Sequence, residues 1–306
     1  MTHVPAERTQ AQNHIRDTAR DKVFYVICNV VVTMLMLLVL YPLIYILSAS
    51  FSSASAIISG KMWLWPVDFS LVGYKYILQY YAIWLGYRNT LFYTFTGTAI
   101  NVCMTMTCAY GLSRKGLRGR KFFTLLFTFT MIFAGGMIPS YLLMRDLKLL
   151  NTVWCMLLPG AISAYNLIVA RTFIENNIPE DLLEAARIDG CSDVHFFFSI
   201  VLPLSRAILA VLVLMYAAGH WNAYFNAFLY LTDKQLYPLQ IFLRQILVQS
   251  AFSSDMLDPE AMAQMQTLQQ ILKYTVIVIS TVPMLCLYPL VQKYFEQGIM
   301  IGSLKG

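Results

Sequence analysis

Long apolar segments without Asp, Glu, Lys or Arg constrain the fold of this chain more than any other feature. The first runs from Val23 to about Leu47, and five others lie at Asn89–Ser113, Phe122–Met144, Leu149–Ala170, Ala207–Thr232 and Tyr274–Gln292. A helix needs about 20 apolar residues to cross the hydrocarbon core of a bilayer. Charged residues make up 12% of the chain, against about 25% in soluble domains. We therefore predict an all-α polytopic membrane protein with six transmembrane helices.

The positions of Lys and Arg predict its orientation, because cytoplasmic loops carry an excess of both. Basic residues occur in the tail 1–22 and cluster in Arg114–Lys121, between the second and third segments. Two spans separate these regions, so both fit the cytoplasmic side. Six spans from 23 to 296 then place the tail 297–306 inside as well. The net charge of +6 fits this topology and contact with anionic lipids, with no nucleic-acid partner.

The same count places a polar segment, about 174–204, on the cytoplasmic side between spans four and five. Pro179 and the acidic residues after it favour a helix start, and Gly190 can end that helix in a left-handed conformation. Ser192 or Asp193 can cap a second helix through Val194–Val201. Leu182, Leu183, Ala186 and Ile188 would give the first helix an apolar side. We predict a helix–turn–helix on the cytoplasmic surface.

The order E-A-A at Glu184–Ala186, then Gly190, then I-x-L-P at Ile200–Pro203 resembles the cytoplasmic signature of ABC importer permeases. The wider motif N-x-x-P-x-D-L-x-E-A-A-R-I-D-G at Asn176–Gly190, Trp221-Asn222 and the tail Lys293–Gly306 extend the likeness. The chain is similar to carbohydrate permeases such as the second membrane subunit of the maltose importer, and above all to LplC/YtcP-like oligosaccharide permeases. This resemblance implies the ABC type I importer fold and a location in a bacterial cytoplasmic (inner) membrane.

The resemblance also implies three protein partners. They are a second homologous permease subunit, a dimer of the ABC ATPase and an extracytoplasmic solute-binding protein. The residues that would couple this chain to the ATPase are Glu184, Ala185, Ala186, Asp189 and Gly190. External segments 48–87 and 233–272 would carry contacts to the binding protein.

Polar side chains within spans are costly and often face a cavity or another helix. The fifth span and the fourth carry the candidates for a substrate pathway: His220, Trp221, Asn222, Tyr224, Asn226, Tyr165 and Asn166. Aromatic rings can stack on sugars, and amides and hydroxyls can bond their hydroxyl groups. These residues also fit a packing role. Gly135, Gly136 and Pro139 are expected to bend or break the third span.

Motifs for catalysis are missing from the sequence. There is no Walker A glycine–lysine loop, H-E-x-x-H or G-x-S-x-G. We expect a non-catalytic subunit without metal or cofactor, whose partner ATPase binds ATP and Mg. Two alternatives are a permease for amino acids or polyamines and an ion-coupled secondary transporter. The second would be expected to carry ionisable groups within its spans, where this chain has little beyond His220.

Overall fold

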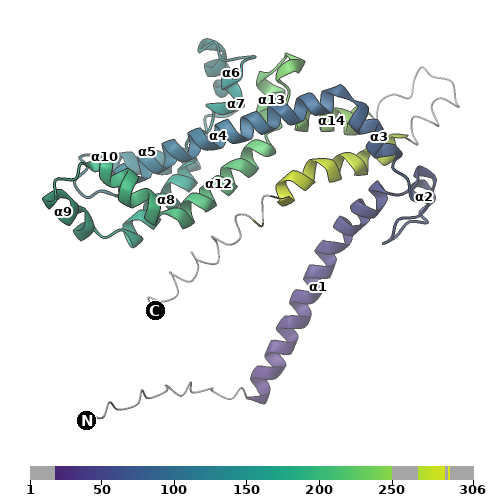
Figure 1. Cartoon of the computed structure of the whole chain (residues 1–306), viewed down its shortest axis with the longest axis horizontal. Coiled ribbons are helices and arrows are strands. Elements are labelled where there is room, and N and C mark those ends of the chain that lie inside the picture. The colour runs from purple at the N-terminus through teal and green to yellow at the C-terminus, as the bar shows by residue number, and fades with distance from the viewer. Residues whose placement is uncertain (1–17, 250–267, 287–288, 290–306) are drawn as a thin grey trace, which may run out of the picture.

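A computed structural model describes residues 18–249, 268–286 and 289 of the chain, and all regular elements among them are helices (Figure 1). The first half contains α1 (Ala19–Ser50), α2 (Ala54–Ile58), α3 (Val72–Gln79), α4 (Tyr81–Ser113), α5 (Arg120–Ile132), α6 (Met137–Asp146) and α7 (Trp154–Leu157). Next come α8 (Ala164–Asn177), α9 (Glu180–Ile188), α10 (Asp193–Phe196), the π-helical turn η1 (Phe197–Val201), α11 (Leu202–Leu204) and α12 (Arg206–Trp221). Then follow α13 (Phe225–Tyr230), the 3-10 turn η2 (Lys234–Leu236), α14 (Leu239–Gln249) and a helix at Leu268–Cys286.

Helix α4 is the central helix of the described structure. Its 33 residues extend about 50 Å at 1.5 Å per residue, and α8, α12 and α14 pack along it. Helices α9 and α10 lie near one end of α4, whereas α3 and α14 lie near the other (Figure 1). Its buried face is partly polar: Asn89 and Thr90 are followed at intervals of three or four residues by Thr94, Thr98, Asn101 and Thr105.

Two described helices are long and apolar enough to cross a membrane alone, α1 and Leu268–Cys286. Thr18 and Asp21 form a capping box at the start of α1, which satisfies backbone N–H groups that the helix cannot pair internally. The apolar body of α1 is exposed along its length, and only Ser48, Ala49 and Ser50 at its end are buried. In Figure 1, α1 extends away from the other helices.

Three apolar segments predicted as single spans are interrupted. The segment Phe122–Met144 consists of α5 and α6, which bend by 117°. The break contains Gly135 and Gly136, as predicted, and Gly136 has a φ of +84°, which favours glycine. Helices α5 and α6 together have the length and composition of a broken span or a re-entrant loop.

The segments Leu149–Ala170 and Ala207–Thr232 are not continuous helices either. The first contains α7 and part of α8, because Pro159 and Gly160 (φ +73°) interrupt the backbone between them. The second contains α12 and α13. At the end of α12, the side-chain amide of Asn222 donates to the carbonyl of Ala218 at 2.9 Å. Length and composition missed these breaks because neither segment contains Asp, Glu, Lys or Arg, and each is long enough for a single span.

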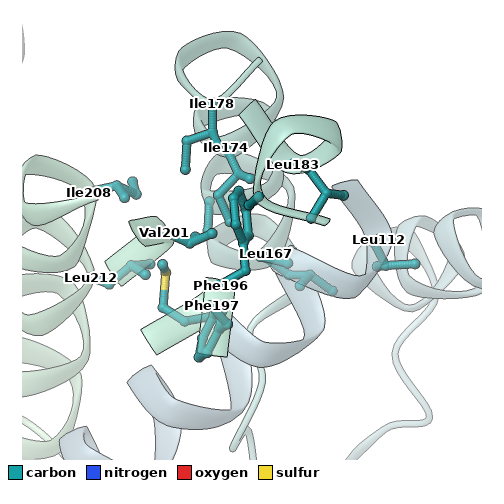
Figure 2. Packing of buried hydrophobic residues seen from close by; sticks show 14 of the residues in the cluster. Leu112, Leu167, Ile174, Ile178, Leu183, Phe196, Phe197, Val201, Ile208 and Leu212 are labelled. Carbon is teal, nitrogen blue, oxygen red and sulfur yellow. The ribbon is translucent and has the colours of Figure 1, made fainter. Parts of the chain in front are cut away.

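The largest buried cluster joins α9, α10 and η1 to α4, α8 and α12 (Figure 2). Phe196, Val201, Leu212, Leu167 and Ile174 are all nearly inaccessible to solvent within it. Side chains from the polar cytoplasmic segment predicted at 174–204 thus contribute to the same core as the long helices. Movement of this segment would therefore be transmitted to α4 and α12 through packed side chains.

Candidate functional site

The E-A-A segment forms the predicted helix–glycine–helix. Pro179 precedes α9, and Glu180 and Asp181 lie in its first turn, where acidic groups favour the positive end of the helix dipole. Gly190 follows with a φ of +77°. The hydroxyl of Ser192 accepts from the backbone N–H of His195 and caps α10. Local sequence signals therefore determine the shape of this segment.

Helix α9 has a buried face and an exposed face. Leu183 and Ala186 are buried against the large core, whereas Glu184 and Ala185 are exposed. The expected apolar side is wrong at Leu182 and Ile188, which are 37% and 87% exposed. Ile188 lies five residues beyond Leu183, and 3.6 residues per turn carry it away from the buried face.

The second helix of the segment is more complex than predicted. It begins as α10, widens to a π-helical turn in η1 and ends in α11, which carries Pro203 in its first turn. It then bends by 82° into α12 at Ser205. Phe196, Phe197 and Val201 enter the core, while Val194 and Phe198 are exposed. Exposed apolar side chains thus also occur on α10 and η1.

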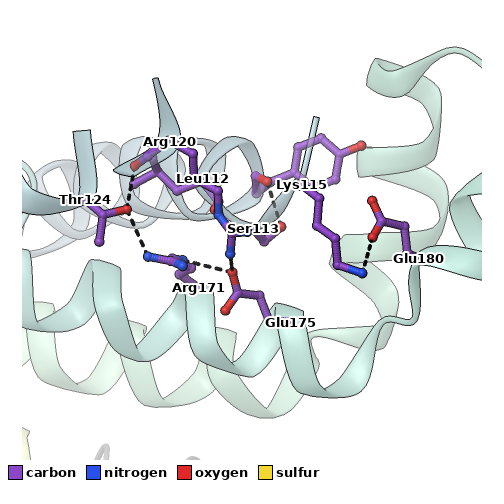
Figure 3. Close-up of polar contacts among 9 residues, drawn as sticks. Leu112, Ser113, Lys115, Arg120, Thr124, Arg171, Glu175 and Glu180 are labelled. Atoms are coloured by element: carbon purple, nitrogen blue, oxygen red, sulfur yellow. Dashed lines mark hydrogen bonds and ion pairs between the residues drawn. The ribbon is translucent and has the colours of Figure 1, made fainter. Parts of the chain in front are cut away.

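Ion pairs join α8 and α9 to the basic segment after α4 (Figure 3). Nζ of Lys115 lies 2.8 Å from Oε2 of Glu180. Arg120 pairs with Glu175, and Nε of Arg171 lies 2.9 Å from the same carboxylate oxygen. One carboxylate with two partly buried guanidinium groups makes a network, which holds geometry better than an isolated surface pair.

The contact between Lys115 and Glu180 favours the charged form of both groups. The hydrogen bond with Glu180 raises the pKa of Lys115, and the hydrogen bond from Lys115 lowers the pKa of Glu180. Arg114 lies nearby, with its guanidinium carbon 4.6 Å from the ring centre of Tyr110 and 5.7 Å from that of Phe196. This cation–π contact connects the last turn of α4 to α10.

The candidate pathway residue His220 is bonded within the helix bundle. Its Nε2 lies 3.0 Å from Oδ1 of Asn101, and the amide of Asn101 donates to the carbonyl of Gly160 at 3.1 Å. Helices α4 and α12 approach closely here, because a Cβ added to Gly97 would lie 2.3 Å from Nε2 of His220. Asn101 is buried and was not predicted as a site residue.

The other predicted pathway residues are dispersed. Trp221 is buried and donates to the carbonyl of Ser280 at 3.0 Å. Its side chain also borders an apolar groove of about 630 Å³ between α4, α12 and η1. Asn222 is exposed, and Asn226 is half-buried on α13. At the start of α8, Tyr165 is exposed, whereas Asn166 is buried.

Tyr224 alone of the predicted set borders a second cavity, of about 330 Å³. Gln240, Arg244 and Ser280 supply polar groups there, and Leu243 and Val276 supply apolar surface. Arg244 was not predicted as a site residue, although it is the sole charged residue of α14.

Known proteins resemble this chain in sequence over most of its length. Residues 15–301 match the family model of the binding-protein-dependent transport system inner membrane component. The chain is 41% identical over 288 residues to the polygalacturonan/rhamnogalacturonan transport system permease protein YtcP of Bacillus subtilis (strain 168), covering 94% of this chain and 100% of YtcP. It is 38% identical over 265 residues to the protein LplC of the same organism, covering 87% of this chain and 89% of LplC.

A solved structure is also similar. It is a crystal structure of a bacterial ABC transporter involved in the import of the acidic polysaccharide alginate, with a TM-score of 0.82 and 35% sequence identity. The match covers 92% of this chain and 99% of that chain. The expected resemblance to carbohydrate ABC importer permeases and the type I importer fold is confirmed. The chain is therefore a membrane protein that belongs to the family of binding-protein-dependent transport system inner membrane components.

Proposed function

We propose that this chain is one permease subunit of an ATP-driven importer of sugars or oligosaccharides. The observation that carries the proposal is the exposed face of α9, with Glu184, Ala185 and Ile188 at the end of a helix bundle. Ion pairs hold α9 to the segment that follows α4. The carbohydrate names of the relatives and the alginate importer support the cargo class.

In this mechanism the exposed face of α9 contacts a cytoplasmic ATPase dimer, which binds ATP and Mg. Closure of the dimer moves the coupling segment 174–204, and Gly190 lets its two helices change their relative angle. Phe196 and Val201 transmit that movement to the core. The substrate pathway then opens to the opposite side of the membrane. This chain performs no catalysis itself.

The proposed topology has six spans with both termini in the cytoplasm, and two contacts support it. The end of α1 contacts α3, where the hydroxyls of Ser50 and Tyr74 lie 2.9 Å apart. The start of the helix Leu268–Cys286 also lies against α3, since Gly73 closely approaches Thr275. In this topology α1 ends near α3 and the helix Leu268–Cys286 begins near it, and each helix crosses to the opposite side of the membrane. The tails 1–17 and 290–306 lie outside the described residues.

A second permease subunit would complete the pathway as a heterodimer, and the exposed apolar body of α1 offers surface to it and to membrane lipids. A solute-binding protein would dock at the α3 end, where Trp63 and Trp65 are exposed. Part of the second external segment predicted for this contact, 250–267, lies outside the described residues.

The test is uptake by proteoliposomes that contain the chain, its second permease and its ATPase, with binding protein outside and ATP inside. The proposal predicts ATP-dependent uptake of oligosaccharides and none of glutamine or spermidine. A proton ionophore should leave uptake unchanged. Uptake of an amino acid or polyamine in place of oligosaccharides would support the first alternative. Uptake that persists without the ATPase and stops with the ionophore would support the second.

A further inference from the structure

Arg244 lies in the cavity of about 330 Å³ that also contains Tyr224, Gln240 and Ser280. Its guanidinium carbon is 4.6 Å from the ring centre of Tyr224 and 4.9 Å from that of Phe228. These two rings are themselves stacked, with centres 5.8 Å apart. Two aromatic rings thus contact the cation, in a cavity lined by both polar and apolar side chains.

Within the described residues, no carboxylate forms an ion pair with Arg244, whereas Arg120 and Arg171 share Glu175. A guanidinium that lies over a ring keeps its N–H groups at its edge, where they can donate to a further group. The planar fork of arginine matches a carboxylate through two parallel hydrogen bonds. Gln240 adds amide groups that suit sugar hydroxyls.

The cavity lies at the end of α4 opposite to the coupling segment. The backbone N–H of Leu239, the first residue of α14, donates to the hydroxyl of Thr90 at 2.8 Å. The amide of Asn89 donates to the carbonyl of Tyr237 at 3.0 Å. Both contacts are near the start of α4, whereas Arg114 and Lys115 follow its end. In the topology proposed above, Arg244 therefore lies toward the outer side, where cargo enters.

We propose that Arg244, supported by the rings of Tyr224 and Phe228, binds the carboxylate of an acidic sugar residue, a uronate, as the cargo enters. This inference rests on the proposed function and narrows its cargo to acidic oligosaccharides. The rings of Tyr224 and Phe228 orient the guanidinium, and Gln240 bonds hydroxyls of the same or the next sugar. With a neutral oligosaccharide, no carboxylate among the described residues would serve as an anionic partner for the N–H groups of Arg244.

The experiment compares trigalacturonate with its fully methyl-esterified form in the reconstituted complex with ATP and binding protein. The ester keeps the sugar rings and hydroxyls and removes the negative charges. For Arg244→Gln we expect the half-saturating concentration of trigalacturonate to rise about tenfold or more, as expected from loss of a charge-assisted hydrogen bond. Uptake of the ester should change less than about twofold.

Lys234→Gln is the matched control, because it removes an exposed positive charge from η2, at the same end of the molecule. It should leave uptake of both compounds unchanged. Arg244→Lys keeps the charge without the fork and should have an intermediate effect on trigalacturonate alone. If Arg244→Gln does not assemble with the ATPase, uptake of trigalacturonate and of its ester by Arg244→Lys tests the inference instead.

An equal effect of Arg244→Gln on acid and ester, or no effect on either, would overturn the inference and leave the proposed function intact. So would wild-type uptake of neutral oligosaccharides but not of trigalacturonate. If the wild-type complex takes up no oligosaccharide at all, the proposed function fails and the inference fails with it.

Discussion

The ammonium group of Lys115 lies 2.8 Å from the carboxylate of Glu180. Lys115 belongs to the basic segment that follows α4, and Glu180 is the first residue of α9. This contact places the segment that the positive-inside rule predicts to be cytoplasmic against the segment that the E-A-A motif predicts to be cytoplasmic. The two predictions rest on different residues, and the structure brings those residues together at one end of the molecule.

This ion pair should respond to charge reversal. Glu180→Lys places two positive charges together and should reduce oligosaccharide uptake, because α9 loses a tether to α4. Lys115→Glu combined with Glu180→Lys should restore much of that uptake. Equal loss in the single and double variants would show that the pair itself has no role. The hydrogen bond from Lys115 lowers the pKa of Glu180 from its ordinary value of 4.5. The ion pair should therefore persist at pH 4.5 and above, and be lost as the pH falls through the lowered pKa.

The crossing of α4 and α12 should be intolerant of a side chain at Gly97. An added Cβ would lie 2.3 Å from Nε2 of His220, which is bonded to Asn101 and not free to move. Gly97→Ala should destabilise the protein by about 1–3 kcal/mol through overpacking. Thermal unfolding of the detergent-purified protein measures this effect.

Gly111→Ala is the control for that substitution, because it lies on the same helix with no atom within 4 Å of an added Cβ. It should be neutral or slightly stabilising. Combining Gly97→Ala with His220→Ala should recover part of the loss, since the imidazole is the obstacle. A Gly97→Ala protein as stable as the wild type would contradict the close approach of α4 and α12.

The turn in the coupling segment should depend on backbone conformation and not on space. Gly190 has a φ of +77° with no atom within 4 Å of an added Cβ. Gly190→Ala should therefore cost about 1–2 kcal/mol through left-handed strain alone, and reduce uptake by shifting α9. Gly190→Asn should be milder, because asparagine tolerates this conformation better. Gly116→Ala, in open space without a positive φ, should have no effect. Identical uptake in all three variants would remove Gly190 from the coupling mechanism.

The sequence predicted those features that depend on local signals. The caps and glycines determined the shape of 179–203 because they act on neighbouring backbone groups, and Gly135-Gly136 marked the break in the third segment. Composition could not locate the interruptions at Pro159–Gly160 and Asn222, because apolar residues continue on both sides. The contacts of His220 with Asn101 and of Arg244 with Tyr224 join distant parts of the chain, so spacing alone could not reveal them.

The most direct measurement is co-purification of the ATPase with Glu184→Lys, combined with ATP-dependent uptake. Glu184 is exposed on α9, so the substitution should leave folding and membrane insertion intact. Asp146→Lys is the control, because Asp146 is also exposed but pairs only with neighbouring Arg145 among the described residues. The proposed coupling predicts that Glu184→Lys loses the ATPase or uncouples hydrolysis from uptake, while Asp146→Lys behaves as wild type. Unchanged ATPase binding and uptake in Glu184→Lys would contradict it.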